Sequence, residues 1–169
     1  LICLTNRDFV AFIMSDAGKD AEADVRDAAI ANLCANAPEI MTGLIDTRCT
    51  RGADIARQLR FNDDVATAIA HLDEHWDGSG LPTGRTGADI HVGGRIALLT
   101  QVADVFFMAF GPDAARSEIE RRAGSWLDPE LASLFLTLSS QSGCWDQLGA
   151  SDLEASLFAL EPAQLRVDV

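Results

Sequence analysis

Helical periodicity runs through almost the whole chain, and this feature limits the fold most. Apolar residues recur at helical spacing, as Ile55 and Leu59 do, whereas no stretch alternates apolar and polar residues for long. Tyr, which favours strands, is absent. The sequence therefore predicts an all-α fold of about seven to eight helices.

Turn and capping residues divide the chain into predicted helices. These cover residues 6–14, 20–36, 39–47, 50–60, from Asn62 or Asp63 to about Trp76, 92–110, 113–123, 129–139 and 152–159. Asp128-Pro129 is an N-cap followed by proline at the first helical position, and residues 151–154 form a capping box. The glycine-rich block 77–89 predicts a loop. The apolar stretch 92–110 predicts a central helix buried on nearly every side.

Length and composition bound the class of protein. The 169 residues suit a single domain, and the absence of an initiator Met favours a piece of a longer multidomain protein. A formal charge of −13 argues against a nucleic-acid partner and an anionic membrane surface. No apolar run approaches the length of a membrane span. The four cysteines form no CxxC pair, which predicts buried free thiols in a reducing compartment and a cytoplasmic location.

Two aspartates stand next to apolar segments. Asp104 lies within residues 95–110, where an unpaired buried carboxylate is costly. We expect it to bind a metal, to accept hydrogen bonds from the glycine-rich loop or to pair with Arg95. Asp16 follows the apolar run 9–14 with Lys19 three residues on, a spacing suited to an ion pair or to joint contact with a phosphate. The alternative for Asp16 is an ordinary turn cap.

The segment HLDEHWDGSG (71–80) carries further candidate ligands. His71 and His75 share one predicted helical face, where they chelate a metal or act as capping histidines near a helix end. Asp73 and Glu74 point to other faces or turn inward. The densest basic stretch, either an anion-binding face or an exposed face of ion pairs, contains Arg48, Arg51, Arg57 and Arg60.

The stretch HWDGSGLPTGRTGADIHVGGRIALLTQVADVF (75–106) resembles the signature of HD-GYP domains, a branch of the HD metal-dependent phosphohydrolases. The segment GSWLDPELASLFL (124–136) resembles that family's later FDPEL ending, and IMSDAGK (13–19) resembles its HD motif. The resemblance implies an all-α fold and, in active members, hydrolysis of cyclic di-GMP with bound iron or manganese. In such members the metal orients a hydroxide for attack on phosphorus.

The first half of the family pattern is only partly kept. Ser15 stands where the HD motif has its His, whereas Asp16 and Lys19 match the motif's Asp and Lys. Arg48 stands at the next ligand His. A guanidinium there is expected to replace the metal's charge and to pair with Asp16 or Asp104. Together with Lys19, Arg48 and Arg51 are candidates for receiving a nucleotide phosphate.

The second half of the pattern keeps carboxylates and loses imidazoles. Leu72 and Asp73 stand at the family's HH pair, Glu74 matches its Glu, and His71 lies one place too early. Loss of nitrogen ligands weakens binding of iron or manganese. The resemblance therefore implies no cofactor or a weakly bound divalent metal, whose candidate ligands are Asp16, Asp73, Glu74, Asp104 and His71.

Three functions follow from these departures. The leading hypothesis is a degenerate HD-GYP-type domain that acts as a regulatory or interaction module in bacterial cyclic-dinucleotide signalling. Its partner is then another protein, an adjacent domain of the same chain or a second copy in a homodimer. The alternative is an active metal-dependent phosphodiesterase with an altered metal site, in which Asp16 and Lys19 are catalytic. The third is binding of a cyclic dinucleotide without catalysis.

Overall fold

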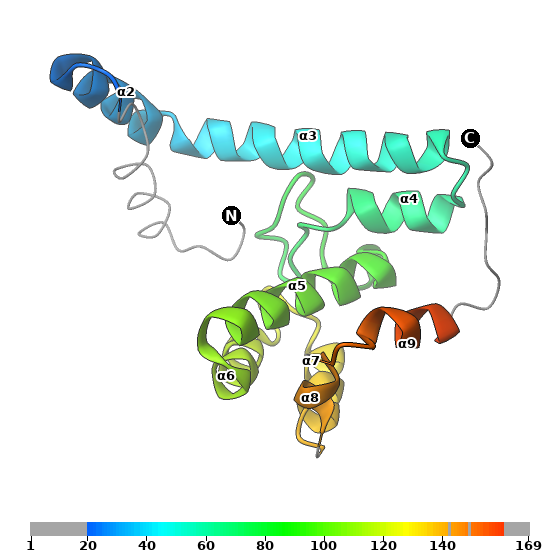
Figure 1. The fold of residues 1–169 in the computed structure, drawn as a ribbon. Helices are drawn as coiled ribbons and strands as arrows, with labels where there is room; N and C mark the ends of the chain where they lie inside the picture. The colour runs from blue at the N-terminus through cyan, green and yellow to red at the C-terminus, as the bar shows by residue number, and fades with distance from the viewer. Residues whose placement is uncertain (1–19, 142, 149, 161–169) are drawn as a thin grey trace.

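The structure is a computed structural model, and it describes residues 20–141, 143–148 and 150–160 (Figure 1). Over these ranges the chain forms eight α-helices, one short 3₁₀ helix and two isolated β-bridges, with no strand. The predicted all-α class is therefore confirmed. The predicted helix 6–14 and the candidates Asp16 and Lys19 lie outside the described residues.

The basic segment of the chain lies on one long helix. α2 (Ala23–Ala35) matches the predicted helix 20–36. α3 (Ala37–Gln58) then continues through the boundary at which the pattern predicts two helices, 39–47 and 50–60, so that prediction is wrong. Residues 44–51 contain neither glycine nor proline, and nothing in the backbone stops the helix there.

The next helix, α4 (Asp63–Ala70), runs beside α3 in Figure 1. Its start is as predicted, because the Asn62 side chain accepts a hydrogen bond from the Val65 amide at 3.0 Å. Its end is not as predicted, since the helix stops at Ala70 instead of near Trp76.

A close approach of His91 and Gly94, at the start of the next long helix, explains this early stop. The His71 Nδ1 atom accepts a hydrogen bond from the His91 amide at 2.9 Å. A Cβ atom built on Gly94 would lie only 2.9 Å from the His71 carbonyl oxygen, so the two backbones nearly touch. These contacts join residues 20 or more positions apart, which a local pattern does not report.

α5 (Val92–Phe110) is the central helix, and it packs against α4, α6 (Pro112–Arg122) and α7 (Pro129–Leu138). Its predicted extent is confirmed. It supplies more residues than any other element to the main core cluster, which contains Leu98, Leu99, Val102, Ala103, Ile119, Leu127 and Ala132.

The burial predicted for this helix is only partly right. Ile96, Val105 and Met108 are exposed, because α5 is covered on one side and open on the other. By length and composition alone α5 is also apolar enough to cross a membrane, contrary to the sequence prediction. Within the described structure it packs against three neighbouring helices along one side.

Capping residues set the remaining boundaries much as predicted. Gly111 ends α5 with a φ of 87°, a left-handed conformation that favours glycine. Asp128 caps α7 by accepting hydrogen bonds from the Glu130 and Leu131 amides. Two short helices follow, α8 (Cys144–Leu148) and α9 (Leu153–Leu160), of which the second was predicted as 152–159.

Candidate functional site

The described candidate residues fall on three elements. Arg48 and Arg51 lie on α3, and His71, Asp73 and Glu74 lie in the turn that follows α4. The third element is α5, which carries Asp104.

Glu74 is buried, and it holds the glycine-rich loop in place. Its side chain is 1% exposed. One carboxylate oxygen accepts hydrogen bonds from the Thr83 amide at 2.8 Å and the Thr83 hydroxyl at 2.5 Å. The other oxygen accepts from the Arg85 amide at 2.8 Å. Both oxygens are therefore occupied by the loop, which gives this carboxylate a structural role.

Gly80 brings the same loop back against the turn. The Leu81 amide donates to the Asp73 carbonyl at 3.0 Å, which closes the loop on its own start. A Cβ atom on Gly80 would lie 2.1 Å from the His75 nitrogen and 2.6 Å from the Asp73 oxygen. No real side chain fits there, so this position requires glycine.

Asp73 is also buried, and Arg48 is its partner. The Arg48 guanidinium forms an ion pair with the Asp73 carboxylate, whose side chain is 2% exposed. The sequence predicts pairing of Arg48 with Asp16 or Asp104. The Asp104 alternative is wrong, because the turn after α4 brings Asp73 against the middle of α3 instead. The Asp16 alternative stays a prediction, since Asp16 lies outside the described residues.

Cys49 shares this buried carboxylate. Its Sγ atom lies 3.4 Å from Asp73 Oδ2, and the residue is 1% exposed. Burial, with a further contribution from the Asp73 charge, raises the pKa of the Cys49 thiol to about 11. Burial likewise raises the pKa of Asp73, against the opposing effect of Arg48. The cysteine is thus an unreactive hydrogen-bond donor, as predicted for a buried thiol, whereas Cys34 is exposed.

The two histidines of this segment do not share a helical face, because α4 ends before them. His71 is the C-cap residue, and burial lowers its pKa. His75 stacks on Trp126 with ring centroids 4.2 Å apart, and its Nδ1 atom lies 2.9 Å from the Ser79 hydroxyl oxygen. Burial lowers the pKa of His75 as well. Both imidazoles are therefore held by the fold.

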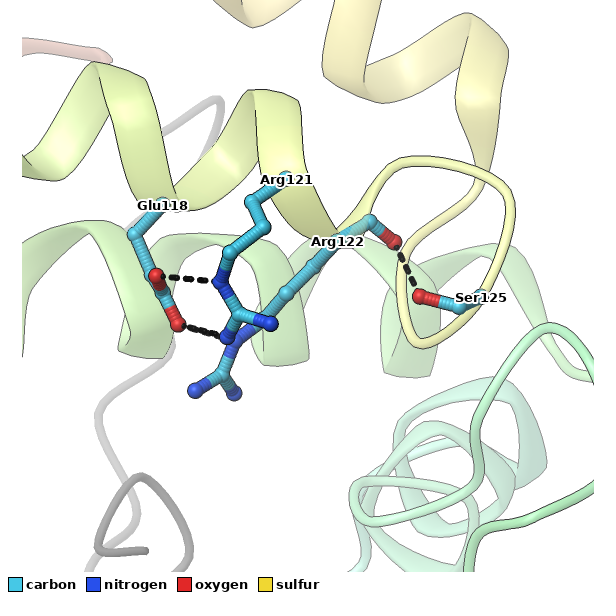
Figure 2. Close-up of polar contacts among 4 residues, drawn as sticks. All are labelled: Glu118, Arg121, Arg122 and Ser125. Atoms are coloured by element: carbon cyan, nitrogen blue, oxygen red, sulfur yellow. Dashed lines mark hydrogen bonds and ion pairs between the residues drawn. The ribbon is translucent and has the colours of Figure 1, made fainter.

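A buried arginine lies on the same tryptophan, and sequence analysis missed it. The Arg122 guanidinium lies 3.9 Å from the Trp126 ring centroid, and its Nε atom donates to Glu118 at 2.5 Å. Figure 2 shows the Glu118 carboxylate facing both Arg121 and Arg122, and the Ser125 hydroxyl bonded to the Arg122 carbonyl oxygen. The spacing of four residues between Glu118 and Arg122 was an available signal for the ion pair.

Asp104 is the exception among these acidic residues. It is exposed, and within the described part of the chain it has no ion pair or hydrogen bond through its side chain. Arg95 was one predicted partner, but its guanidinium donates to Asp128 at 2.6 Å instead. That alternative is therefore wrong, and so is the expectation of a buried carboxylate.

Asp104 lines a cavity of about 230 Å³. The cavity lies between α5, α7 and α8, and its other lining residues are Thr100, Ala103, Phe107, Phe135, Trp145 and Leu148. Its walls are mostly apolar and aromatic. At this place a candidate site residue borders an open pocket.

The described donors do not form a transition-metal centre like the one that the resemblance implies for active family members. Over residues 20–141, 143–148 and 150–160, no three His, Cys, Asp or Glu side chains converge to hold a metal ion. Asp73 is engaged by Arg48, Glu74 by the loop, and His71 by a backbone amide.

Known proteins resemble this chain over most of its length. Residues 29–131 match the family described as HD domain. A curated relative from Vibrio cholerae, the 3'3'-cGAMP-specific phosphodiesterase 3, is 40% identical over 155 residues. This match covers 92% of the present chain and 34% of the relative, so the chain spans about a third of that protein's length.

A solved structure gives the same result for the fold. The crystal structure of cyclic GMP-AMP specific phosphodiesterases from V. cholerae is 38% identical to the chain, with a TM-score of 0.75. The match covers 98% of this chain and 40% of that one. The family match alone spans more than half of the sequence, and it agrees with the signature of residues 75–106. The chain belongs to the HD domain family.

Proposed function

We propose that this chain is an HD domain of a cyclic-dinucleotide phosphodiesterase. The observation that carries the proposal is the 40% identity, over 92% of the chain, to a relative named for hydrolysis of 3'3'-cGAMP. The reaction class is hydrolysis of a phosphodiester bond, in which water attacks phosphorus and a linear dinucleotide is released. The chain spans only 34% of that relative. Two statements are therefore part of the proposal: that the substrate is a cyclic dinucleotide, and that this domain performs the hydrolysis.

Local cations are needed for such a substrate, since the chain carries a formal charge of −13 and a cyclic dinucleotide carries two phosphates. Arg51 is exposed on α3, one turn from Arg48, whose side chain is 43% exposed. The ion pair with Asp73 orients Arg48 without burying it. We therefore propose that Arg48 and Arg51, together with Lys19, contact the phosphates. Asp16 is the proposed catalytic carboxylate of the same motif as Lys19.

A second candidate is a regulatory or interaction domain that has lost the chemistry. The specific observation in its favour is Arg48, which stands at a ligand position of the family pattern and pairs with the buried Asp73. An arginine in that place supplies positive charge where a metal ion would supply it. In this case the turnover belongs to another domain of the same protein, and this domain contacts it or a second copy.

Hydrolysis measured on the chain itself separates the two candidates. The purified chain is reconstituted with iron, manganese or magnesium, its metal content is measured, and its products from 3'3'-cGAMP and cyclic di-GMP are separated by chromatography. Turnover that is lost in Asp16→Asn and kept in Asp113→Asn, an exposed residue of α6, supports an altered active site. Absence of turnover with every metal supports the regulatory candidate.

The proposed function also implies a cytoplasmic location. Cyclic dinucleotides are intracellular signals, so a domain that acts on them works in the cytoplasm. Partners other than the cyclic dinucleotide, whether an adjacent domain or a homodimer, remain predictions. Size-exclusion chromatography of the chain with and without 3'3'-cGAMP tests the homodimer.

A further inference from the structure

We propose that the Asp104 cavity binds a guanine base and that Asp104 reads its edge. This inference rests on the proposed function, because it names the part of a cyclic dinucleotide that the chain recognises. It assigns Asp104 to base recognition, not to metal binding.

The size of the cavity favours one base. Pockets for whole drug-sized ligands are about 300–1,000 Å³. The Asp104 cavity is smaller, at about 230 Å³. It is therefore too small to enclose a cyclic dinucleotide, and it suits one flat ring system with the rest of the ligand outside.

The walls suit a flat ring. Phe107 and Trp145 stack with centroids 4.8 Å apart and an interplanar angle of 29°. Phe135 meets Trp145 edge-on, with centroids 6.0 Å apart. The Trp145 indole N–H donates to the Ser139 carbonyl at 3.0 Å, so the ring is oriented before any ligand arrives. Nucleobases stack on aromatic side chains of this kind.

The polar group selects among the bases. An ionised carboxylate only accepts hydrogen bonds. Guanine presents two adjacent donors, N1–H and the 2-amino group, and Asp104 has no competing partner among the described residues. Adenine has an acceptor nitrogen at N1, where guanine has an N1–H donor. The N1 lone pair of adenine would therefore face the carboxylate oxygens, which are acceptors too. The pair of donors on guanine and the pair of oxygens on Asp104 are complementary.

The experiment measures binding of mononucleotides without metal. GMP, IMP and AMP carry the same phosphate, so differences among them report the base alone. Titrations in EDTA follow the Trp145 indole N–H signal by NMR, assigned with Trp145→Phe, and affinities come from calorimetry. We expect GMP to bind roughly tenfold more tightly than IMP, which lacks the 2-amino group, and AMP to bind more weakly still.

Variants test the role of Asp104 directly. Asp104→Asn should lose the preference for GMP over AMP, by roughly tenfold or more, while the exposed Asp113→Asn should keep it. Equal binding of GMP and AMP, no binding, or an unchanged preference in Asp104→Asn overturns the inference. So does binding of Nα-acetylarginine amide in place of GMP, which would identify a cationic side chain of a protein partner as the ligand.

Failure of this inference and failure of the proposed function are distinguishable. A guanine preference without hydrolysis keeps the inference and removes the phosphodiesterase activity from this domain. Hydrolysis of 3'3'-cGAMP without a guanine preference keeps the proposed function and removes the inference about Asp104.

Discussion

Two acidic regions of this chain differ in how their carboxylates are used. In the turn after α4, Asp73 and Glu74 are buried, and ion pairs and hydrogen bonds occupy their oxygens. On α5, Asp104 is exposed beside an aromatic cavity, with no partner in the described part of the chain. A carboxylate whose oxygens are satisfied by the fold stabilises it, whereas one left open is available to a ligand. Asp73 and Glu74 therefore have structural roles, whereas Asp104 has the proposed role in binding a ligand.

The largest loss of stability is expected for Glu74→Ala. The change leaves the Thr83 and Arg85 amides without their acceptor and opens a cavity under the loop. We expect the free energy of unfolding to fall by about 4 kcal/mol. Urea denaturation measures it, with the exposed Glu120→Ala as control, for which a change within about 0.5 kcal/mol is expected. Equal effects of the two variants would contradict the structural role of Glu74.

Gly80→Ala should be nearly as damaging. The new Cβ atom would meet backbone atoms of Asp73 and His75, none of which yields without moving the turn. We expect a loss of about 3 kcal/mol. Gly43→Ala is the matched control, since no atom lies within 4 Å of its Cβ position on α3. That change should stabilise the helix by about 1 kcal/mol. Thermal unfolding of both variants gives the comparison, and a tolerated Gly80→Ala would mean that the loop does not close on the turn.

Arg48→Ala breaks the ion pair of the same turn, and a smaller loss of about 2 kcal/mol is expected because Arg48 is 43% exposed. The pH dependence of the folding stability shows which protonation state of Asp73 the fold favours. Burial raises the pKa of Asp73, so the folded state keeps its proton at pH values where the unfolded state has lost it. Stability that Asp73 contributes is therefore present below the ordinary Asp pKa and is lost as the pH rises through the raised value.

The free energy of unfolding of the wild type minus that of Asp73→Asn isolates this contribution. Measured by urea denaturation between about pH 4 and pH 8, the difference should decrease as the pH rises. Removal of the favourable Arg48 charge raises the Asp73 pKa further, so in an Arg48→Ala background the decrease should extend to higher pH. A difference that increases with pH would show that Asp73 is stabilised as the anion.

Local signals in the sequence account for most of the fold. The cap at Asn62, the Asp128-Pro129 start and the glycine at position 111 each act within a few residues, and each helix boundary that depends on them was predicted. The end of α4 was missed because it depends on contacts of His71 with His91 and Gly94, across the molecule.

The same distinction explains the site. An apolar neighbourhood in the sequence indicated burial for Asp104, but it does not reveal which side of α5 another helix covers. The partner of Arg48 was also out of reach, because Asp16, Asp73 and Asp104 are all distant from it in the sequence. Burial of Asp73 and Glu74 was one of two orientations offered, and the structure selects it. The roles of Asp16 and Lys19 remain predictions.

The smallest effect on stability is expected at Asp104, and it completes the comparison. Asp104→Asn and Asp104→Ala remove no ion pair and no hydrogen bond of the described chain, and the position is exposed. We expect the free energy of unfolding to change by less than about 0.5 kcal/mol, which urea denaturation resolves against the loss at Glu74. A loss above about 1.5 kcal/mol would show that the fold uses this carboxylate as it uses Glu74. A neutral result, together with a lost preference for GMP, would mean that the aspartate is kept free of internal partners for a ligand.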